Sequence, residues 1–192
     1  PWPPDHGEAL KWQWETKVIP YWKEAAKIAK DNGVTRICFE MHPNFVVYNP
    51  ETLLRLRAAV GNIIGANFDP SHLFWQGIDV TAAIRAIGPA IGHVHAKDCH
   101  IYDENARVNG VLDTKSYTEE PKRSWIFRTV GYGHGASVWR DIVSTLRMVG
   151  YDHVLSIEHE DSLMSGDEGL KKAIAFLKDV LIAEKPGAAY WA

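Results

Sequence analysis

The sequence predicts an α/β protein built from parallel strands joined by helices, and three observations support this. Four apolar runs have the length of β-strands, and stretches with helical spacing of apolar residues separate them. Each run also closes on a residue that can bind a metal ion or transfer a proton. The four runs are Arg36–His42, Ile63–Asp69, Ile91–His95 and Val154–Glu158. Strands that alternate with helices in this way are typical of a parallel sheet.

The composition is ordinary for a globular protein. The chain has 192 residues, of which 46% are hydrophobic and 23% charged, and we expect residues 1–192 to form a single domain. The formal net charge is −3 and the basic residues are scattered, so we expect no nucleic-acid partner. No apolar run approaches the ~20 residues that span a bilayer, so we expect no membrane partner.

Cysteine use and the first residues bear on the compartment. Only Cys38 and Cys99 are present and they form no CxxC pair, so a disulfide framework is not expected and a cytoplasmic location is the default. The chain begins at Pro1 without a signal-peptide pattern. Its loop-like run Pro1–Pro4 indicates a cut or processed start.

The first half of the chain alternates regularly. Residues 7–31 predict a long helix, because apolar residues recur at helical spacing and Asn32-Gly33 supplies a stop. A strand to Glu40, a helix from Asn49-Pro50 and a strand to Asp69 follow. The pattern then predicts a short helix through Trp75, a helix capped by Asp79 and ending near Ile87, and a strand ending near Ala96.

The second half contains one long irregular stretch. Residues 97–135 have no clear periodicity, which is typical of a functional lid or a disordered segment. Trp125, Ile126 and Phe127 give this stretch apolar anchors and favour an ordered, lid-like loop. A helix over 137–149 with Gly150 at its end, a strand to Glu158 and a helix over 166–184 complete the expected elements.

Two architectures accommodate this order: an open doubly wound sheet, or a segment of a (β/α)8 barrel. A full barrel takes about 250 residues, and only four strands are evident here. The central strands of an open sheet would be apolar on both faces, whereas these strands carry polar residues on one face near their ends. Barrels place their chemistry at that end. The sequence therefore favours the C-terminal half of a (β/α)8 barrel, with four βα units.

Side-chain alternation along the strands predicts a single polar site. It places Glu40, Asp69, His95 and Glu158 on the face opposite the apolar residues that helices would cover. A lone acid at a strand end is usually a solvated loop residue, but four such endings favour a site. Two Glu, one Asp and one His suit one divalent ion, foremost Mn²⁺, with Mg²⁺, Co²⁺ or Zn²⁺ as alternatives.

The same residues suggest a reaction. A divalent ion can polarise a substrate carbonyl or hydroxyl and stabilise an enediolate. If Glu40 and Glu158 lie on opposite sides of the ion, one could remove a proton from carbon while the other returns it on the opposite side.

Four motifs in order resemble a known superfamily, the xylose-isomerase-like barrels that include D-tagatose 3-epimerase, hydroxypyruvate isomerase and inosose dehydratase. The similarity covers about residues 34–160. The motifs are Phe39-Glu40-Met41-His42-Pro43, Asp69-Pro70-Ser71-His72, His93-Val94-His95-Ala96-Lys97-Asp98 and Ser156-Ile157-Glu158. Gly131 and Gly133 resemble the Gly-x-Gly turn that precedes the penultimate helix of this superfamily.

The resemblance implies site roles for these residues. Glu40, Asp69, His95 and Glu158 would be the metal ligands, with Glu40 and Glu158 also the acid/base pair. His72 would contact a substrate oxygen, and we expect His42 and Lys97 to join it in binding a small carbohydrate. The N-terminal half of the family barrel has no counterpart, so we expect a homo-oligomer or association with a missing N-terminal half.

The sequence leaves four functions open, of which the first two are favoured in the order given. The first is a metal-dependent isomerase or epimerase of a sugar or ketose, phosphorylated or not. The second is a lyase of the inosose or dehydroshikimate dehydratase type, which would use the same residues. An apurinic-endonuclease-like nuclease is disfavoured, because Trp125-Ile126-Phe127 replaces the Asp-x-His that such enzymes carry and no basic patch is evident. A non-catalytic binding protein is disfavoured by the intact ligand set.

Overall fold

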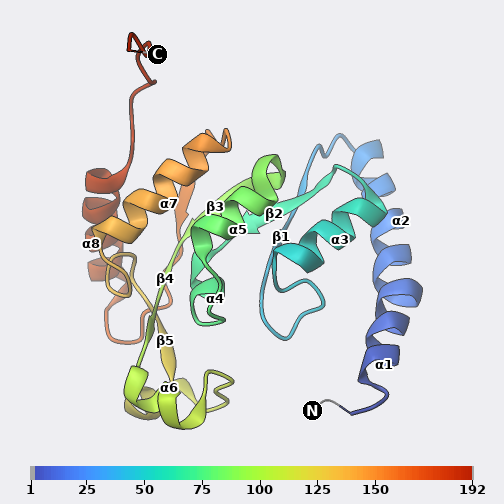
Figure 1. Ribbon diagram of the computed structural model, residues 1–192, viewed down its shortest axis with the longest axis horizontal. Helices are drawn as coiled ribbons and strands as arrows, with labels where there is room; N and C mark the ends of the chain where they lie inside the picture. Colours follow the sequence, from blue (N-terminus) through green and yellow to red (C-terminus); the bar gives the residue numbers. More distant parts are fainter. Residues whose placement is uncertain (1–2, 192) are drawn as a thin grey trace.

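The computed structural model describes residues 3–191, so Pro1 and Trp2 of the expected loop-like start lie outside the described residues. Within that range four parallel strands form one sheet in the order β1-β2-β3-β6 (Figure 1). Their bounds are Ile37–Glu40 for β1, Ile64–Phe68 for β2, Ile91–Ala96 for β3 and Leu155–Ile157 for β6. All four expected strands are confirmed, and the chain forms half of a TIM barrel.

Helices cover the outer face of this sheet, as the apolar pattern predicts. These helices are α3 (Pro50–Val60), α5 (Val80–Ile87), α7 (Ala136–Met148) and α8 (Gly166–Val180). Phe68 and Val94 point outward from their strands and are fully buried, as are Leu56, Ile84 and Trp139 on the helices. The core therefore lies between the sheet and its helices, and it fixes the strand ends at which the polar residues stand.

Two of the expected helices begin at the residues that the sequence predicts, and each has an N-cap side chain. Asn49 accepts a hydrogen bond from Thr52 N at 2.9 Å at the start of α3, and Asp79 accepts one from Ala82 N at 2.9 Å at the start of α5. Each bond satisfies a backbone donor that the first helical turn leaves free.

The long N-terminal helix runs along one side of the molecule, next to α3 (Figure 1). It consists of α1 (His6–Trp12), a π-helical segment η1 (Gln13–Val18) and α2 (Ile19–Asp31). The periodicity predicts one uninterrupted helix, and the structure differs only in the π segment. Pro20 explains it, because proline lacks the N–H that would bond Thr16 and its ring crowds that carbonyl.

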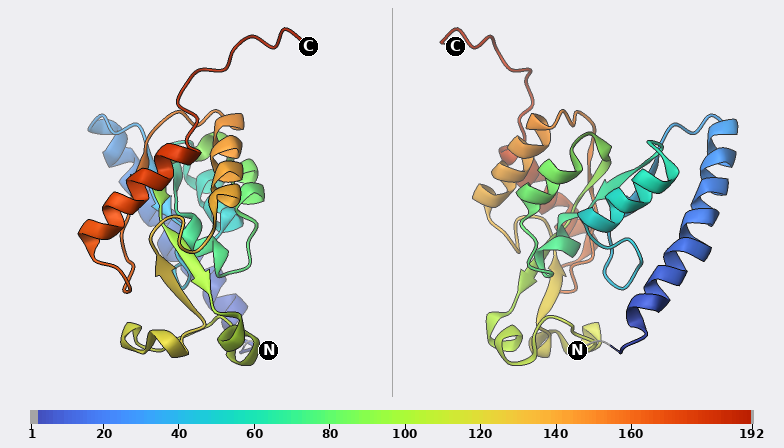
Figure 2. Two further views of the ribbon diagram at one scale, coloured as in Figure 1. Left: turned by 90° about the vertical axis from the view of Figure 1, so that its left-hand side faces the viewer. Right: turned by 45° about the vertical axis from the view of Figure 1, so that its right-hand side comes forward.

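Residues 97–135, expected as an ordered, lid-like loop, form an arm that contains regular helices and strands (Figure 2). The arm contains β4 (Asp98–Ile101), α6 (Asp103–Asn109), a 3₁₀ segment η3 (Tyr117–Lys122) and β5 (Trp125–Arg128). β4 and β5 pair antiparallel, with Cys99 opposite Phe127. Trp75, Cys99, Trp125 and Phe127 form a second small core under it. The strands are only four residues each and lack a clean alternation, which is why the sequence pattern did not predict them.

The last helix is shorter than expected, because α8 ends at Val180 and not near residue 184. Val180 is buried, whereas Leu181 and Ile182 are exposed, so the helix ends where its packed face ends. Arg147 donates a hydrogen bond to Ile182 O at 3.0 Å just beyond this end. No helix in the described range 3–191 is long and apolar enough to cross a bilayer.

Candidate metal centre

The four expected ligands come from the C-terminal ends of the four parallel strands. Glu40 is the last residue of β1, and His95 is the next-to-last residue of β3. Asp69 follows β2 directly and accepts a hydrogen bond from Ser71 N at 2.8 Å, so the start of α4 (Pro70–Phe74) holds its carboxylate in place. Glu158 follows β6. Parallel pairing places these ends at one edge of the sheet, which brings residues far apart in the chain to one place.

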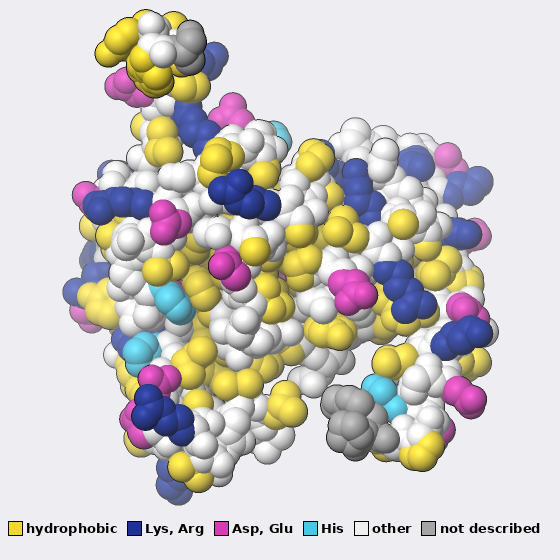
Figure 3. Space-filling model, viewed as in Figure 1, with side chains coloured by type: hydrophobic (Ala, Val, Ile, Leu, Met, Phe, Trp, Pro, Cys, Tyr) yellow, Lys and Arg dark blue, Asp and Glu magenta, His cyan; other side chains and the backbone are white. Residues whose placement is uncertain are grey.

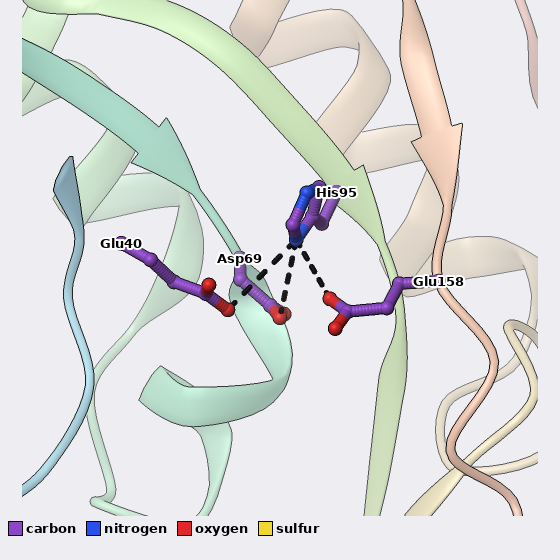
Figure 4. A group of neighbouring side chains, drawn as sticks. All are labelled: Glu40, Asp69, His95 and Glu158. Carbon is purple, nitrogen blue, oxygen red and sulfur yellow. Dashed lines mark ion pairs between the residues drawn. The ribbon is translucent and has the colours of Figure 1, made fainter. Parts of the chain in front are cut away.

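The four side chains converge. One ligand atom from each of Glu40, Asp69, His95 and Glu158 lies within 4.8 Å of the others. The Nδ1 of His95 is 2.7 Å from Glu158 Oε2, 3.8 Å from Glu40 Oε1 and 3.8 Å from Asp69 Oδ2. Figure 4 shows Glu40 and Glu158 reaching toward the centre from opposite sides, with Asp69 between them. Three carboxylates and one imidazole are an oxygen-rich set suited to one divalent ion.

Burial supports the same interpretation. Asp69 Oδ2, His95 Nδ1 and Glu158 Oε2 are each buried, and they contact one another and Lys97 as ion pairs. Carboxylates that are crowded together and partly buried repel one another, and a divalent cation among them would offset that repulsion. These residues fit a divalent cation held by Glu40, Asp69, His95 and Glu158.

The carboxylates and histidines perturb one another strongly. Hydrogen bonds from His72 and then His95 lower the pKa of Glu40 far below its usual range. Asp69 and Glu40 raise the pKa of His95 to about 10, against an opposing contribution from burial. A histidine and a glutamate shifted in opposite directions share one electrostatic site.

Lys97 lies inside this site and not on the surface. Its ammonium is 3.1 Å from Asp69 Oδ2, 3.1 Å from Glu158 Oε2 and 3.0 Å from Glu160 Oε2, and it stands 4.6 Å from the centre of the Phe127 ring. Burial alone would lower the pKa of Lys97, but the three carboxylates raise it above its usual value. Together a divalent ion and this ammonium would neutralise the three ligand carboxylates.

Two further histidines border the ligands. His72 is buried, and its Nε2 lies 3.0 Å from Glu40 Oε1 and 3.5 Å from Asp69 Oδ2. The ring of His42 lies 4.3 Å from that of His72, and its Nδ1 is 2.7 Å from Pro43 O. The structure thus brings His72 and Lys97 into direct contact with the ligand set, while His42 reaches it through His72.

Sequence reasoning missed three carboxylates that matter here, because Glu160 and Asp161 resemble ordinary loop residues and Asp98 had no assigned role. Glu160 bonds Lys97, a contact that its position two residues beyond Glu158 could have suggested. Asp161 accepts from Arg128 Nε at 3.0 Å and Thr129 N at 2.8 Å. No sequence signal predicts that pairing.

Asp98 is the most heavily bonded of the three. Its Oδ2 accepts from the backbone N–H groups of Gly131, Gly133 and His134 and from Trp139 Nε1, at 2.9–3.2 Å. Gly131 has a φ of +90°, which glycine adopts without strain. Asp98 therefore fixes the turn Gly131–Gly135 beside the root of the arm.

The strand order and the carboxylate–histidine cluster define a parallel α/β half-barrel with a polar site at its C-terminal edge. The chain belongs to the xylose isomerase-like TIM barrel family, whose model matches residues 2–180. It is 43% identical over 180 residues to the uncharacterised protein YfiH of Bacillus subtilis (strain 168), covering 94% of this chain and 58% of YfiH.

Solved structures share the fold at low identity. The probable 3-DHS dehydratase AsbF of Bacillus anthracis aligns with a TM-score of 0.61 and 19% identity, covering 83% of this chain and 55% of AsbF. The D-psicose 3-epimerase of Clostridium cellulolyticum H10 aligns with a TM-score of 0.56 and 18% identity, covering 86% of this chain and 55% of the epimerase. The chain spans about half the length of the curated relatives it matches.

Proposed function

We propose that this chain carries the metal-binding and proton-transferring half of a divalent-metal-dependent isomerase or epimerase that acts on a sugar or ketose. The observation that carries the proposal is the convergence of Glu40, Asp69, His95 and Glu158 within 4.8 Å, with ligand atoms of Asp69, His95 and Glu158 that are buried. Such a set suits Mn²⁺ first, with Mg²⁺, Co²⁺ or Zn²⁺ as alternatives.

Differences in exposure support a division of labour among the three carboxylates. The Asp69 side chain is 0% exposed, so it can serve only as a ligand. The Glu40 and Glu158 side chains are 31% and 32% exposed and approach from opposite sides (Figure 4). Each can therefore face both the ion and a substrate. In this proposal one takes a proton from the carbon beside the carbonyl and the other returns it.

The remaining polar groups suit an oxygen-rich substrate. When bound, a divalent ion would polarise the carbonyl and hydroxyl oxygens of the substrate. The Lys97 side chain is only 2% exposed, so its positive charge would act on a substrate oxygen through the carboxylates it contacts, and Glu160 holds its ammonium at the site. His72, at 3%, would act in the same way through Glu40, and we assign the direct contact with a substrate oxygen to the half-buried His42. A dehydratase would share the first proton abstraction, so product analysis separates the two reactions.

The partner is proposed from the sheet edges. β1 and β6 each pair with only one strand among the described residues, and a closed barrel leaves no such edges. We propose that a second half-barrel, on a missing N-terminal half or a second copy, covers them. Acidic and basic side chains are intermixed on the face drawn in Figure 3, which does not favour a nucleic acid.

The test combines metal binding with proton exchange. We expect the parent chain to bind one Mn²⁺ per molecule and to wash solvent deuterium into the carbon beside the carbonyl in a panel of ketoses. Glu158→Gln should abolish wash-in, and Glu40→Gln should retain some ion but lose turnover. His95→Ala should weaken ion affinity.

The control is Glu24→Gln, which changes an exposed glutamate of α2 outside the ligand set and should match the parent. A parent protein that binds none of the four ions would reject the site. Wash-in that persists in Glu40→Gln would reject its acid/base role.

A further inference from the structure

Asn67 stands behind the candidate ligand His95. It lies in β2, where a register shift between Ala66 and Asn67 pairs Asn67 with His93 of β3. Its side-chain Nδ2 is 3.2 Å from Nε2 of His95, on the opposite side of the imidazole from Nδ1. Asn67 Oδ1 is buried and has no hydrogen-bond partner. The Asn67 amide thus hydrogen-bonds the imidazole of His95.

Metal binding by His95 would require a hydrogen-bond acceptor at the position of this amide. The Nδ1 of His95 faces Glu40, Asp69 and Glu158, so an ion among them would be bound by Nδ1. A neutral imidazole that binds a metal through one nitrogen carries its proton on the other. The Nε2–H of His95 would then need an acceptor, and Asn67 is the group within reach.

The Asn67 amide can supply this acceptor by rotating through half a turn. In the structure Nδ2 of Asn67 lies 3.2 Å from Nε2 of His95, while Nδ1 of His95 lies 2.7 Å from Glu158 Oε2. A half-turn about the Cβ–Cγ bond exchanges the amide oxygen and nitrogen and brings Oδ1 to Nε2. Because Oδ1 has no partner, no hydrogen bond at the oxygen end opposes the turn.

We infer that Asn67 is a positioning residue for the metal centre, whose side-chain oxygen accepts Nε2–H of His95 and thereby keeps the Nδ1 lone pair directed at the ion. The inference rests on the proposed metal site. Outer groups that orient a metal-binding histidine typically change metal affinity by about 10–100-fold when removed. The same loss is expected here, without loss of the fold.

The test measures Mn²⁺ affinity by isothermal titration for the parent chain and three variants. Asn67→Leu keeps the shape but cannot accept a hydrogen bond, and should weaken Mn²⁺ binding by about 10–100-fold. Asn67→Asp can still accept Nε2–H and should bind at least as tightly as the parent. Asn105→Leu removes an amide in the arm that bonds only backbone oxygens, and should leave affinity unchanged.

A second readout does not depend on any variant folding. In the Zn²⁺-loaded parent, ¹⁵N-edited NMR of the histidine rings should show His95 with its proton on Nε2. A proton on Nδ1 in that state, or equal Mn²⁺ affinities for Asn67→Leu and the parent, would overturn the inference. So would an Asn67→Asp variant as weak as Asn67→Leu. A parent that binds neither ion would instead reject the proposed site itself.

Discussion

Replacing Asp98 by asparagine should destabilise the fold severely although it alters only one atom position. The Asp98 side chain is fully buried. Its Oδ2 accepts four N–H groups, and its Oδ1 accepts Cys99 N at 2.9 Å and lies 2.7 Å from His134 Nδ1. An asparagine has one oxygen, so it cannot serve both sets of donors.

The magnitude follows from the better of the two amide orientations. With its oxygen at the Oδ2 position, the amide keeps four bonds but loses their charge assistance, which roughly halves each one. Its NH₂ group then faces the N–H of Cys99, leaving a buried donor without an acceptor at a cost of about 1–3 kcal/mol. Because these bonds belong to one network, their losses do not simply add, and we take about 3–5 kcal/mol, the range seen when one partner of a buried charged pair is removed.

Thermal unfolding followed by circular dichroism measures this effect. At about 2–4 °C per kcal/mol for a chain of this size, Asp98→Asn should lower Tm by about 6–20 °C. Asp103→Asn makes the same change on a side chain that is 76% exposed and should leave Tm within about 2 °C of the parent. Equal Tm values for the two variants would refute the claim that Asp98 fixes the Gly131–Gly135 turn.

Three further outcomes are expected. Gly133→Ala would drive a Cβ into Cys99 O and should lower the free energy of unfolding in urea by about 3 kcal/mol. In the control Gly7→Ala the new Cβ meets nothing within 4 Å, so this variant should not be destabilised. Equal effects of the two substitutions would contradict the close packing at Gly133. Mn²⁺ affinity should rise with pH between 6 and 8, because the pKa of His95 is raised to about 10 and the imidazole must lose a proton before it can bind the ion. An affinity that calorimetry finds independent of pH would argue against His95 as a ligand. Burial alone would raise the pKa of Asp113, but hydrogen bonds from Lys115 N and Ser124 N lower it to about 2, so its ionised form stabilises the fold above pH 4. The destabilisation caused by Asp113→Asn should therefore shrink as pH falls from 5 to 2, and a constant difference in acid titrations would contradict that pKa.

The sheet and its helices could be predicted from the sequence because each of these elements carries a local signal. The strand ends at Glu40 and Asp69, the capping residues Asn49 and Asp79 and the apolar outer face depend on alternation and on short-range hydrogen bonds. The strands of the arm could not be predicted, because β4 and β5 are short and are stabilised by the packing of Trp125 and Phe127 with Trp75, which is distant in the sequence.

The sequence by itself determined the class of fold and the residue types of the site, since alternation along a parallel strand fixes which side chains share a face. Only the tertiary structure decided how those side chains meet. It buried Lys97 among three carboxylates, joined Glu160 to it, and placed the Asn67 amide behind His95. These contacts join residues as far as 63 positions apart. They are therefore determined by strand order and register, and no local sequence pattern could predict them.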